Sequence, residues 1–217
     1  MKMTGEIIAV ILAGIVCVLF LGGRSSRREE SAYEEAQEFY ENREYESALS
    51  GFEKLGDYAD ASGMAEKCRY RLSADGRFLE ALSEALSERW DAVDADEEEA
   101  GASESGGEDG ERVRRGIYCE IELGYLAGFD IDQIADASLR ADARSYLNCL
   151  REAEALTGEK GLADADFESR WAKLYRCRRT LICRFAEKYG LAVDEEHEVY
   201  LDAMRVHAAE DSEEKIS

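Results

Sequence analysis

Apolar residues recur every three or four positions along most of this chain, which is the spacing of one face of an α-helix. Strict alternation of apolar and polar residues is scarce, and the 217 residues include no proline. Long stretches rich in Ala, Glu, Leu and Arg also favour helix. The pattern therefore predicts an all-α protein.

In the second half, this periodicity outlines separate helices. In the first of them, Val113, Ile117, Ile121 and Tyr125 share one face, and Gly190 is the expected C-terminal stop of a long later helix. The expected helices are Arg112–Ala127, Ile134–Leu156, one from Asp164 or Asp166 to about Tyr189, and one from about Asp194 to Ala209.

Near the N-terminus, the segment Ile7–Gly23 is uninterruptedly apolar. As a helix it would span roughly 25 Å, close to the thickness of a bilayer core, so it predicts a transmembrane helix. The alternatives are a buried core helix and a cleaved signal peptide. Against the latter, the preceding residues carry only Lys2 as a basic side chain, and no small-x-small cleavage site follows.

Charges around this segment suggest an orientation. Arg24, Arg27 and Arg28 follow it, whereas Lys2 and the amino terminus precede it. The excess of positive charge after the segment favours a single-pass protein with a cytoplasmic C-terminal body. Five cysteines in the body, an odd number, fit reduced thiols on that side. The alternative is the opposite topology, with an extracytoplasmic body.

The first half contains a helical hairpin pattern and a second copy of it. Two antiparallel helices with a turn near residues 41–43 would bring small and aromatic side chains to one interface. Tyr45, Ala48 and Phe52 are followed 33 residues later by Phe78, Ala81 and Ala85, with Gly76 at the turn. The predicted packing residues are Ala36, Phe39, Tyr45, Ala48, Phe52, Leu55, Tyr58, Gly76, Phe78 and Ala81.

These residues, with the linker Leu55-Gly56-Asp57-Tyr58-Ala59-Asp60, resemble the tetratricopeptide repeat, in a bacterial variant with the linker Leu-Gly-Asp-Tyr-x-Asp. Arg43 stands where the family usually has the turn glycine. The resemblance covers about residues 32–90 and implies a helical scaffold that presents surfaces to other proteins. A generic pair of helical hairpins is the alternative.

Charge is distributed unevenly over the chain, whose net charge is −22. Residues 91–111 hold ten acidic and no basic residues around a Gly/Ser-rich centre, which predicts a flexible loop. Calcium binding there is disfavoured because Glu99 and Ser105 occupy the positions where a calcium loop needs glycine and glutamate. So acidic a body would repel nucleic acid.

One later helix is basic. It offers a face for an acidic partner or for the acidic loop; the other reading is a core helix whose charges are solvated or paired. The candidate residues are Arg170, Lys173, Arg176, Arg178, Arg179, Arg184 and Lys188.

No catalytic or metal-binding constellation emerges from the sequence. His197 and His207 are expected to be solvated surface residues, and Cys177 and Cys183 do not share a helix face. The sequence therefore predicts no catalytic, cofactor-binding or metal-binding residue, and no small-molecule substrate. An enzyme would require a site assembled from residues distant in sequence.

Together these features predict an N-terminal transmembrane helix followed by antiparallel helical hairpins: a tetratricopeptide-like solenoid fragment and a C-terminal helical bundle. The expected function is a membrane-tethered scaffold or adaptor that binds unidentified proteins. The alternative is an extracytoplasmic, envelope-associated binding or structural protein. The predicted segments are a tail (1–6), the transmembrane helix (7–23), a basic juxtamembrane segment (24–30), repeats (31–90), an acidic linker (91–111), a C-terminal domain (112–210) and a tail (211–217).

Overall fold

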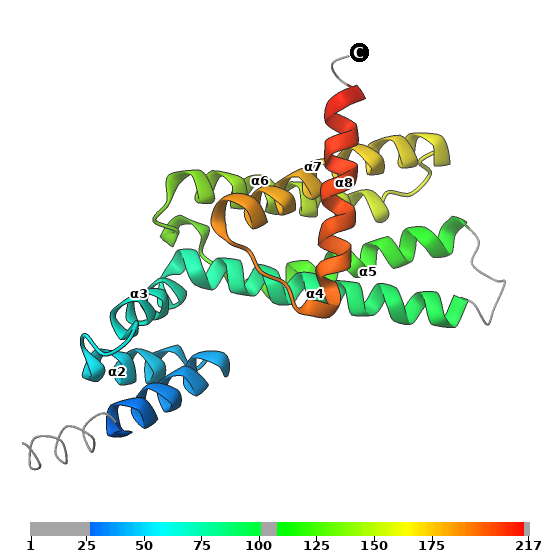
Figure 1. Cartoon of the computed structure of the whole chain (residues 1–217). Coiled ribbons are helices and arrows are strands. Elements are labelled where there is room, and N and C mark those ends of the chain that lie inside the picture. The colour runs from blue at the N-terminus through cyan, green and yellow to red at the C-terminus, as the bar shows by residue number, and fades with distance from the viewer. Residues whose placement is uncertain (1–26, 101–107, 215–217) are drawn as a thin grey trace, which may run out of the picture. The chain divides into compact units, whose positions relative to one another are not determined.

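The computed structural model describes residues 27–100 and 108–214, which form helices joined by short connections (Figure 1). No β-strand occurs within those two ranges, and the predicted all-α class is confirmed for them. The chain divides into two compact units, Met1–Ser73 and Ala74–Ser217. We call them the first and the second unit.

The first unit contains a helix at residues 27–41, α2 (Tyr45–Leu55) and α3 (Ala61–Leu72). Its core combines small side chains, which let the helices approach closely, with aromatic rings that fill the space between them. The buried members of this core are Ala36, Ala48, Phe52, Ala61, Ala65 and Cys68.

Two tight turns of the first unit use left-handed backbone. Arg43, between the first helix and α2, has a φ of 61°, and Gly56, directly after α2, has a φ of 58°. Glycine adopts this conformation without steric strain, whereas a side chain at the same φ is disfavoured. The turn at Arg43 therefore forms despite the residue it contains, because the hairpin packing on either side favours it.

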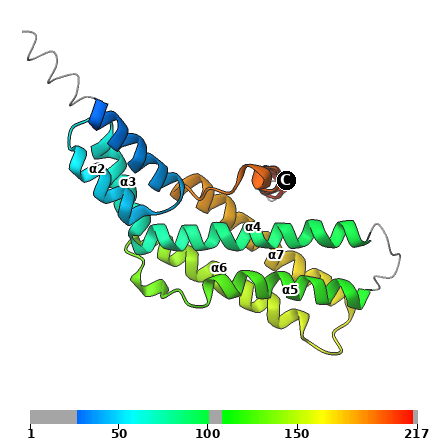
Figure 2. The ribbon, with the colours of Figure 1, turned by 90° about the horizontal axis from the view of Figure 1, so that it is seen from below.

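The second unit contains α4 (Ala74–Ala100), α5 (Glu108–Leu126), α6 (Ala137–Thr157), α7 (Asp164–Tyr189) and α8 (Glu198–Glu214). Figure 2 shows α4 and α5 running side by side as an antiparallel hairpin, with α6 and α7 behind them. The last helix, α8, crosses the others and packs on α7 (Figure 1).

Aromatic rings lie at the centre of this second unit. Phe78 of α4 contacts both Phe129 and Phe185 edge-on, with ring centroids 5.5 and 5.9 Å apart. Tyr146 of α6 contacts the same Phe185 at 5.8 Å. Edge-to-face contacts of this kind add to the burial energy of the rings. They join α4, α6, α7 and the α5–α6 connection into one core.

Local signals in the sequence account for several helix ends. The carboxylate of Asp136 accepts a hydrogen bond from the backbone N–H of Leu139 at 2.8 Å and caps α6. Gly190, with a φ of 72°, ends α7 as predicted, and the N–H of Leu191 donates to the carbonyl of Phe185. Short 3₁₀ turns at Ile131–Gln133 and Glu195–His197 precede α6 and α8.

One prediction about location is corrected. Within residues 27–100 and 108–214, no helix combines the length and the apolar character needed to cross a membrane. This finding contradicts the predicted single-pass membrane localisation, which we do not retain. The apolar run Ile7–Gly23 and residues 24–26, which include the basic Arg24, lie outside the described residues.

The acidic segment also differs from its prediction. Residues 91–100 continue α4, and residues 108–111 belong to the first turn of α5, so these parts of the expected flexible linker are helical. Helix persists here because α4 packs lengthwise on α5, and this packing outweighs the acidic composition. Residues 101–107 lie outside the described part.

The predicted second repeat is placed differently as well. Only Ser73 separates α3 from α4, so Gly76 lies within the first turns of α4 rather than at a turn. Phe78 is fully buried in the core of the second unit, and Ala81 packs against that same core. The boundary between the units therefore falls after Ser73 and not after Trp90, because α4 contributes its apolar face to the second unit.

Candidate functional site

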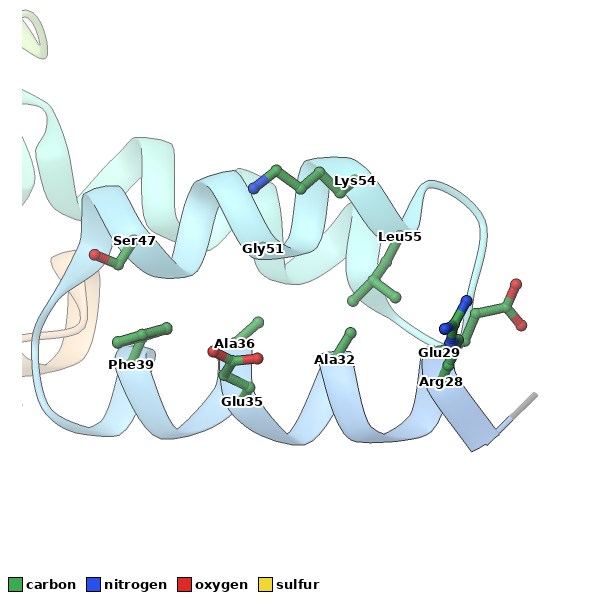
Figure 3. Close-up of a pocket in the computed structure, with 10 residues that line it drawn as sticks. All are labelled: Arg28, Glu29, Ala32, Glu35, Ala36, Phe39, Ser47, Gly51, Lys54 and Leu55. Carbon is green, nitrogen blue, oxygen red and sulfur yellow. The ribbon is translucent and has the colours of Figure 1, made fainter. Parts of the chain in front are cut away.

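An open groove runs between the first helix and α2, and all ten of its lining residues come from these two helices (Figure 3). It encloses about 300 Å³. Its apolar side chains are only half-buried at Ala32, Phe39 and Leu55, so they are accessible from outside. The lining residues are Arg28, Glu29, Ala32, Glu35, Ala36, Phe39, Ser47, Gly51, Lys54 and Leu55.

Small residues make the floor of this groove. The two helices approach so closely at Gly51 that a Cβ there would lie 2.7 Å from the Cβ of Ala36. Such contacts between small residues bring helix backbones together and leave a shallow apolar channel beside them. Phe39 and Leu55 stand at the two ends of this channel (Figure 3).

The rim carries both signs of charge. Its exposed basic side chains are Arg28 and Lys54, and its exposed acidic side chains are Glu29 and Glu35. A mixed rim of this kind favours a peptide with its own charged side chains over a highly charged polymer. The groove thus combines an apolar floor with a polar edge, as protein-binding surfaces commonly do.

The structure brings most of the predicted packing residues of the first repeat together. Ala36, Ala48 and Phe52 are buried at one interface, and Tyr45 is 9% exposed. Phe39 and Leu55 pack on this core and also line the groove. Tyr58 is half-buried in the α2–α3 connection, where its ring lies 6.1 Å from that of Tyr33. Gly76, Phe78 and Ala81 belong to the other unit.

Only part of the predicted basic face of α7 is exposed to solvent. Arg178 and Arg179 are buried, at 2% and 8% exposure, which corrects the expectation that they present charge to a partner. At roughly 100° per residue, the remaining members share an exposed stripe, whereas these two point to other sides of the helix. The exposed members are Arg170, Lys173, Arg176, Arg184 and Lys188.

Neighbouring groups within the chain pair several of these exposed cations. Arg170 contacts Glu159 at 2.7 Å, Arg184 contacts Asp142 at 2.6 Å, and Lys188 donates to the hydroxyl of Tyr189. A second groove of about 510 Å³ lies beside Arg170 and Lys173, between α6 and α7. Because an ion pair already engages Arg170, this groove is a weaker candidate than the apolar one in the first unit.

A buried ion cluster occupies the interior of the second unit. Glu122 of α5 is fully buried; it accepts hydrogen bonds from Arg178 and from the hydroxyl of Tyr146, and it lies 3.2 Å from Arg89. Burial disfavours the charged guanidinium of Arg178, but the Glu122 carboxylate, Tyr146 and Cys119 together outweigh it, so the pKa of Arg178 is raised. Burial and the same carboxylate raise the pKa of Tyr146.

This cluster is structural in character. Its carboxylate is paired with the guanidinium groups of Arg178 and Arg89, and pairing of this kind is how buried ions are tolerated. Sequence reasoning missed it because Glu122 and Arg89 stand in strongly charged helices, where a solvated position is the default expectation. The one available signal was that Glu122 falls on the same helix face as Cys119 and Leu126.

Two further groupings were not foreseen. The Sγ atoms of Cys149 and Cys177, on α6 and α7, lie 2.7 Å apart, and burial followed by hydrogen bonding to Cys177 raises the pKa of Cys149 to about 12. His197 was expected at the surface but is only 3% exposed. Its ring contacts Trp90, and its Nε2 lies 3.0 Å from Asp91, so it belongs to the packing of α4 on the start of α8.

Within the described ranges, no group of three or more His, Cys, Asp or Glu side chains is arranged to hold a metal ion. Comparison with known proteins found no match: no protein family, no curated protein and no solved structure matches this chain.

Proposed function

We propose that this chain is a helical scaffold that binds another protein, and that the groove between the first helix and α2 is its binding site. The observation that carries the proposal is the apolar lining of this groove, whose floor is formed by Ala36 and Gly51 and whose accessible side chains are Ala32, Phe39 and Leu55. The sequence resemblance to tetratricopeptide repeats supports the same function.

The partner that fits is an amphipathic α-helix. A channel between two helices accepts a third helix by ridges-into-grooves packing, and α3 already packs on this hairpin in that way. The apolar side chains of the incoming helix would cover Phe39 and Leu55, while its charged side chains would meet Glu35 and Lys54 at the rim. Burial of apolar area supplies most of the affinity.

Two serines of α2 offer a matched test. Ser47 lines the groove and Ser50 does not, although both are exposed on the same helix. We expect Ser47→Trp to fill the channel and to lower the recovery of a specific copurifying protein by at least about tenfold, which corresponds to ~1.4 kcal/mol of binding free energy. Ser50→Trp adds the same ring outside the channel and should leave recovery unchanged.

The experiment is quantitative mass spectrometry of proteins that copurify with the tagged full-length chain and with each variant. Circular dichroism of both variants checks that the helices are retained. If the same proteins copurify in the same amounts with the Ser47→Trp and Ser50→Trp chains, the groove is not the binding site and the proposed function loses its support.

A further inference from the structure

Two cysteines of the second unit are in contact across neighbouring helices. Cys149 of α6 and Cys177 of α7 are both free thiols, and their Sγ atoms lie 2.7 Å apart. A disulfide bond is about 2.05 Å long, so the two sulfurs need to approach by only about 0.65 Å to form one. Because α6 and α7 pack against each other, the fold itself brings these two thiols together.

This pair is more accessible to solvent than the other described cysteines. Cys149 and Cys177 are half-buried, whereas Cys68, Cys119 and Cys183 are buried, with exposed fractions of 0%, 0% and 6%. A reaction partner must reach a cysteine before it can be oxidised, so exposure selects among the thiols of a folded chain. The Cys149–Cys177 pair meets both requirements for a disulfide, which are a neighbouring thiol and access from outside.

The surroundings of Cys149 do not favour its thiolate. Burial, the hydrogen bond to Cys177 and the nearby carboxylate of Glu152 raise the pKa of Cys149 to about 12, although Arg178 acts in the opposite direction. A pair whose thiolate is stabilised is a strong oxidant, because its reduced form is favoured. The Cys149–Cys177 pair lacks this stabilisation, so its disulfide should form slowly at neutral pH and should resist reduction once formed.

The two cysteines lie at the base of the α6–α7 hairpin. Residues 150–176, which we call the hairpin tip, contain the end of α6, the connection and the start of α7. All eight residues that line the groove of about 510 Å³ between these helices belong to the hairpin tip. A disulfide between Cys149 and Cys177 would therefore close a covalent ring that contains this groove.

We propose that Cys149 and Cys177 form a redox site that low-molecular-weight disulfides oxidise, and that the resulting cross-link restrains the hairpin tip. One cysteine loses its proton to solvent, and its thiolate attacks the small disulfide to give a mixed disulfide and one small thiolate. The second cysteine then attacks the protein sulfur of the mixed disulfide and releases the other small thiolate. Both released thiolates take up protons, so two protein thiols and one small disulfide become one protein disulfide and two small thiols.

Intact-mass spectrometry in a glutathione buffer tests the chemistry. The full-length chain carries Cys17→Ser so that only the described thiols remain, and it is incubated at about pH 8.5 with about 1 mM each of oxidised and reduced glutathione until its mass is constant. We expect more than about 90% of the chains to lose two hydrogens and to carry no glutathione, because the second thiol acts at high effective concentration. Peptide mapping should show Cys149 linked to Cys177, and dithiothreitol should reverse the reaction.

Three variants separate this reaction from unspecific oxidation. Cys149→Ser and Cys177→Ser each lack one partner, so the remaining thiol should stop at the mixed disulfide, seen as chains that gain the mass of one glutathione. Cys68→Ala removes a buried cysteine of the first unit and should leave the Cys149–Cys177 disulfide unchanged. Circular dichroism should show the same helix content in all of these chains.

Amide hydrogen exchange tests the restraint on the hairpin tip. The disulfide removes the openings in which α6 and α7 separate at the base of the hairpin. Amides of residues 150–176 should therefore exchange at least about threefold more slowly in the oxidised chain than in the reduced one. Amides of residues 27–73, in the first unit, are the internal control and should exchange at the same rate in both.

Either experiment can overturn the proposal. A folded chain that stays reduced in the glutathione buffer, or that ends with a glutathione on each of the two cysteines, would show that the two sulfurs do not meet. Equal exchange of the hairpin tip in the oxidised and reduced chains would show that the disulfide forms without restraining the hairpin.

Discussion

The two units bury different kinds of side chain. Among the described residues of the first unit, the buried core consists of alanines, a cysteine and aromatic rings, and it contains no charged group. The second unit buries Glu122 together with three arginines and a histidine. The first unit is thus stabilised by close packing of small and aromatic side chains, and the second unit also depends on the pairing of buried charges. Removing a buried charge should therefore lower the stability of the second unit, whereas the first unit should be sensitive to added side-chain volume.

Removing the central carboxylate should have the largest effect. Glu122→Ala leaves Arg178 and Arg89 buried without their counter-ion, so we expect it to destabilise the second unit by about 3–5 kcal/mol. Chemical denaturation followed by circular dichroism measures the loss. Glu120→Ala, one position on the exposed side of the same helix, should change stability by less than ~0.5 kcal/mol. Equal effects of the two variants would show that the ion cluster does not hold the unit together.

Oxidation of the Cys149–Cys177 pair should have the next largest effect. Diamide should accept two hydrogens from the two thiols and leave an intramolecular disulfide between α6 and α7, lowering the intact mass by about 2 Da and stabilising the second unit by about 2 kcal/mol. Because the pKa of Cys149 is raised to about 12, little thiolate is present at neutral pH. The oxidation should therefore be faster at pH 9 than at pH 7. Failure to form the disulfide in the folded chain would contradict the packing of α6 on α7.

Adding one methyl group should have the third largest effect on stability, and the sign of this effect should differ between the two units. In the first unit, Gly51→Ala would place a Cβ 2.7 Å from that of Ala36, so we expect a loss of about 1–3 kcal/mol despite the better helix propensity of alanine. In the second, Gly124→Ala enters open space and should stabilise α5 by up to ~1 kcal/mol. Thermal unfolding at low protein concentration measures both. A stabilising Gly51→Ala would mean that the first helix and α2 are not in close contact.

Exposed ion pairs should have the smallest effect, and the same one in both units. Arg69 contacts Glu53 in the first unit at 2.7 Å, and Arg144 contacts Asp132 in the second at 2.6 Å, with all four side chains at least half exposed. Arg69→Ala and Arg144→Ala should each change stability by less than ~0.5 kcal/mol. A loss of several kcal/mol from either would show that surface charge, and not only buried charge, supports the fold.

The sequence predicted the helical class and the hairpin of the first unit because periodic alanines and aromatics encode their own interface. The sequence did not predict the burial of residues whose positions depend on contacts with residues far away in the chain. Arg178 was expected on a basic surface, but Glu122, 56 residues earlier in the chain, holds it in the core. Val113 and Ile117 follow the pattern of a buried face, yet the ion cluster occupies the inside of α5 and leaves them exposed.

The groove could be foreseen only in part. The predicted contact of Ala36 with α2 lies at its floor, but the role of Gly51 depends on the separation of two helix axes, which no local pattern specifies. The α3–α4 boundary was missed for a related reason. Phe78 repeats the spacing of the first hairpin, whereas its actual neighbours, Phe129 and Phe185, lie far along the chain.

Site-specific photocrosslinking tests the proposed protein-binding groove most directly. A benzophenone amino acid is introduced at Ser47 of the full-length chain, or at Ser50 as the matched control, and the cells are irradiated. The proposal predicts a discrete crosslinked protein from position 47, whose yield exceeds that from position 50 at least about tenfold. Equal crosslinking from both positions, or none from position 47, would contradict it.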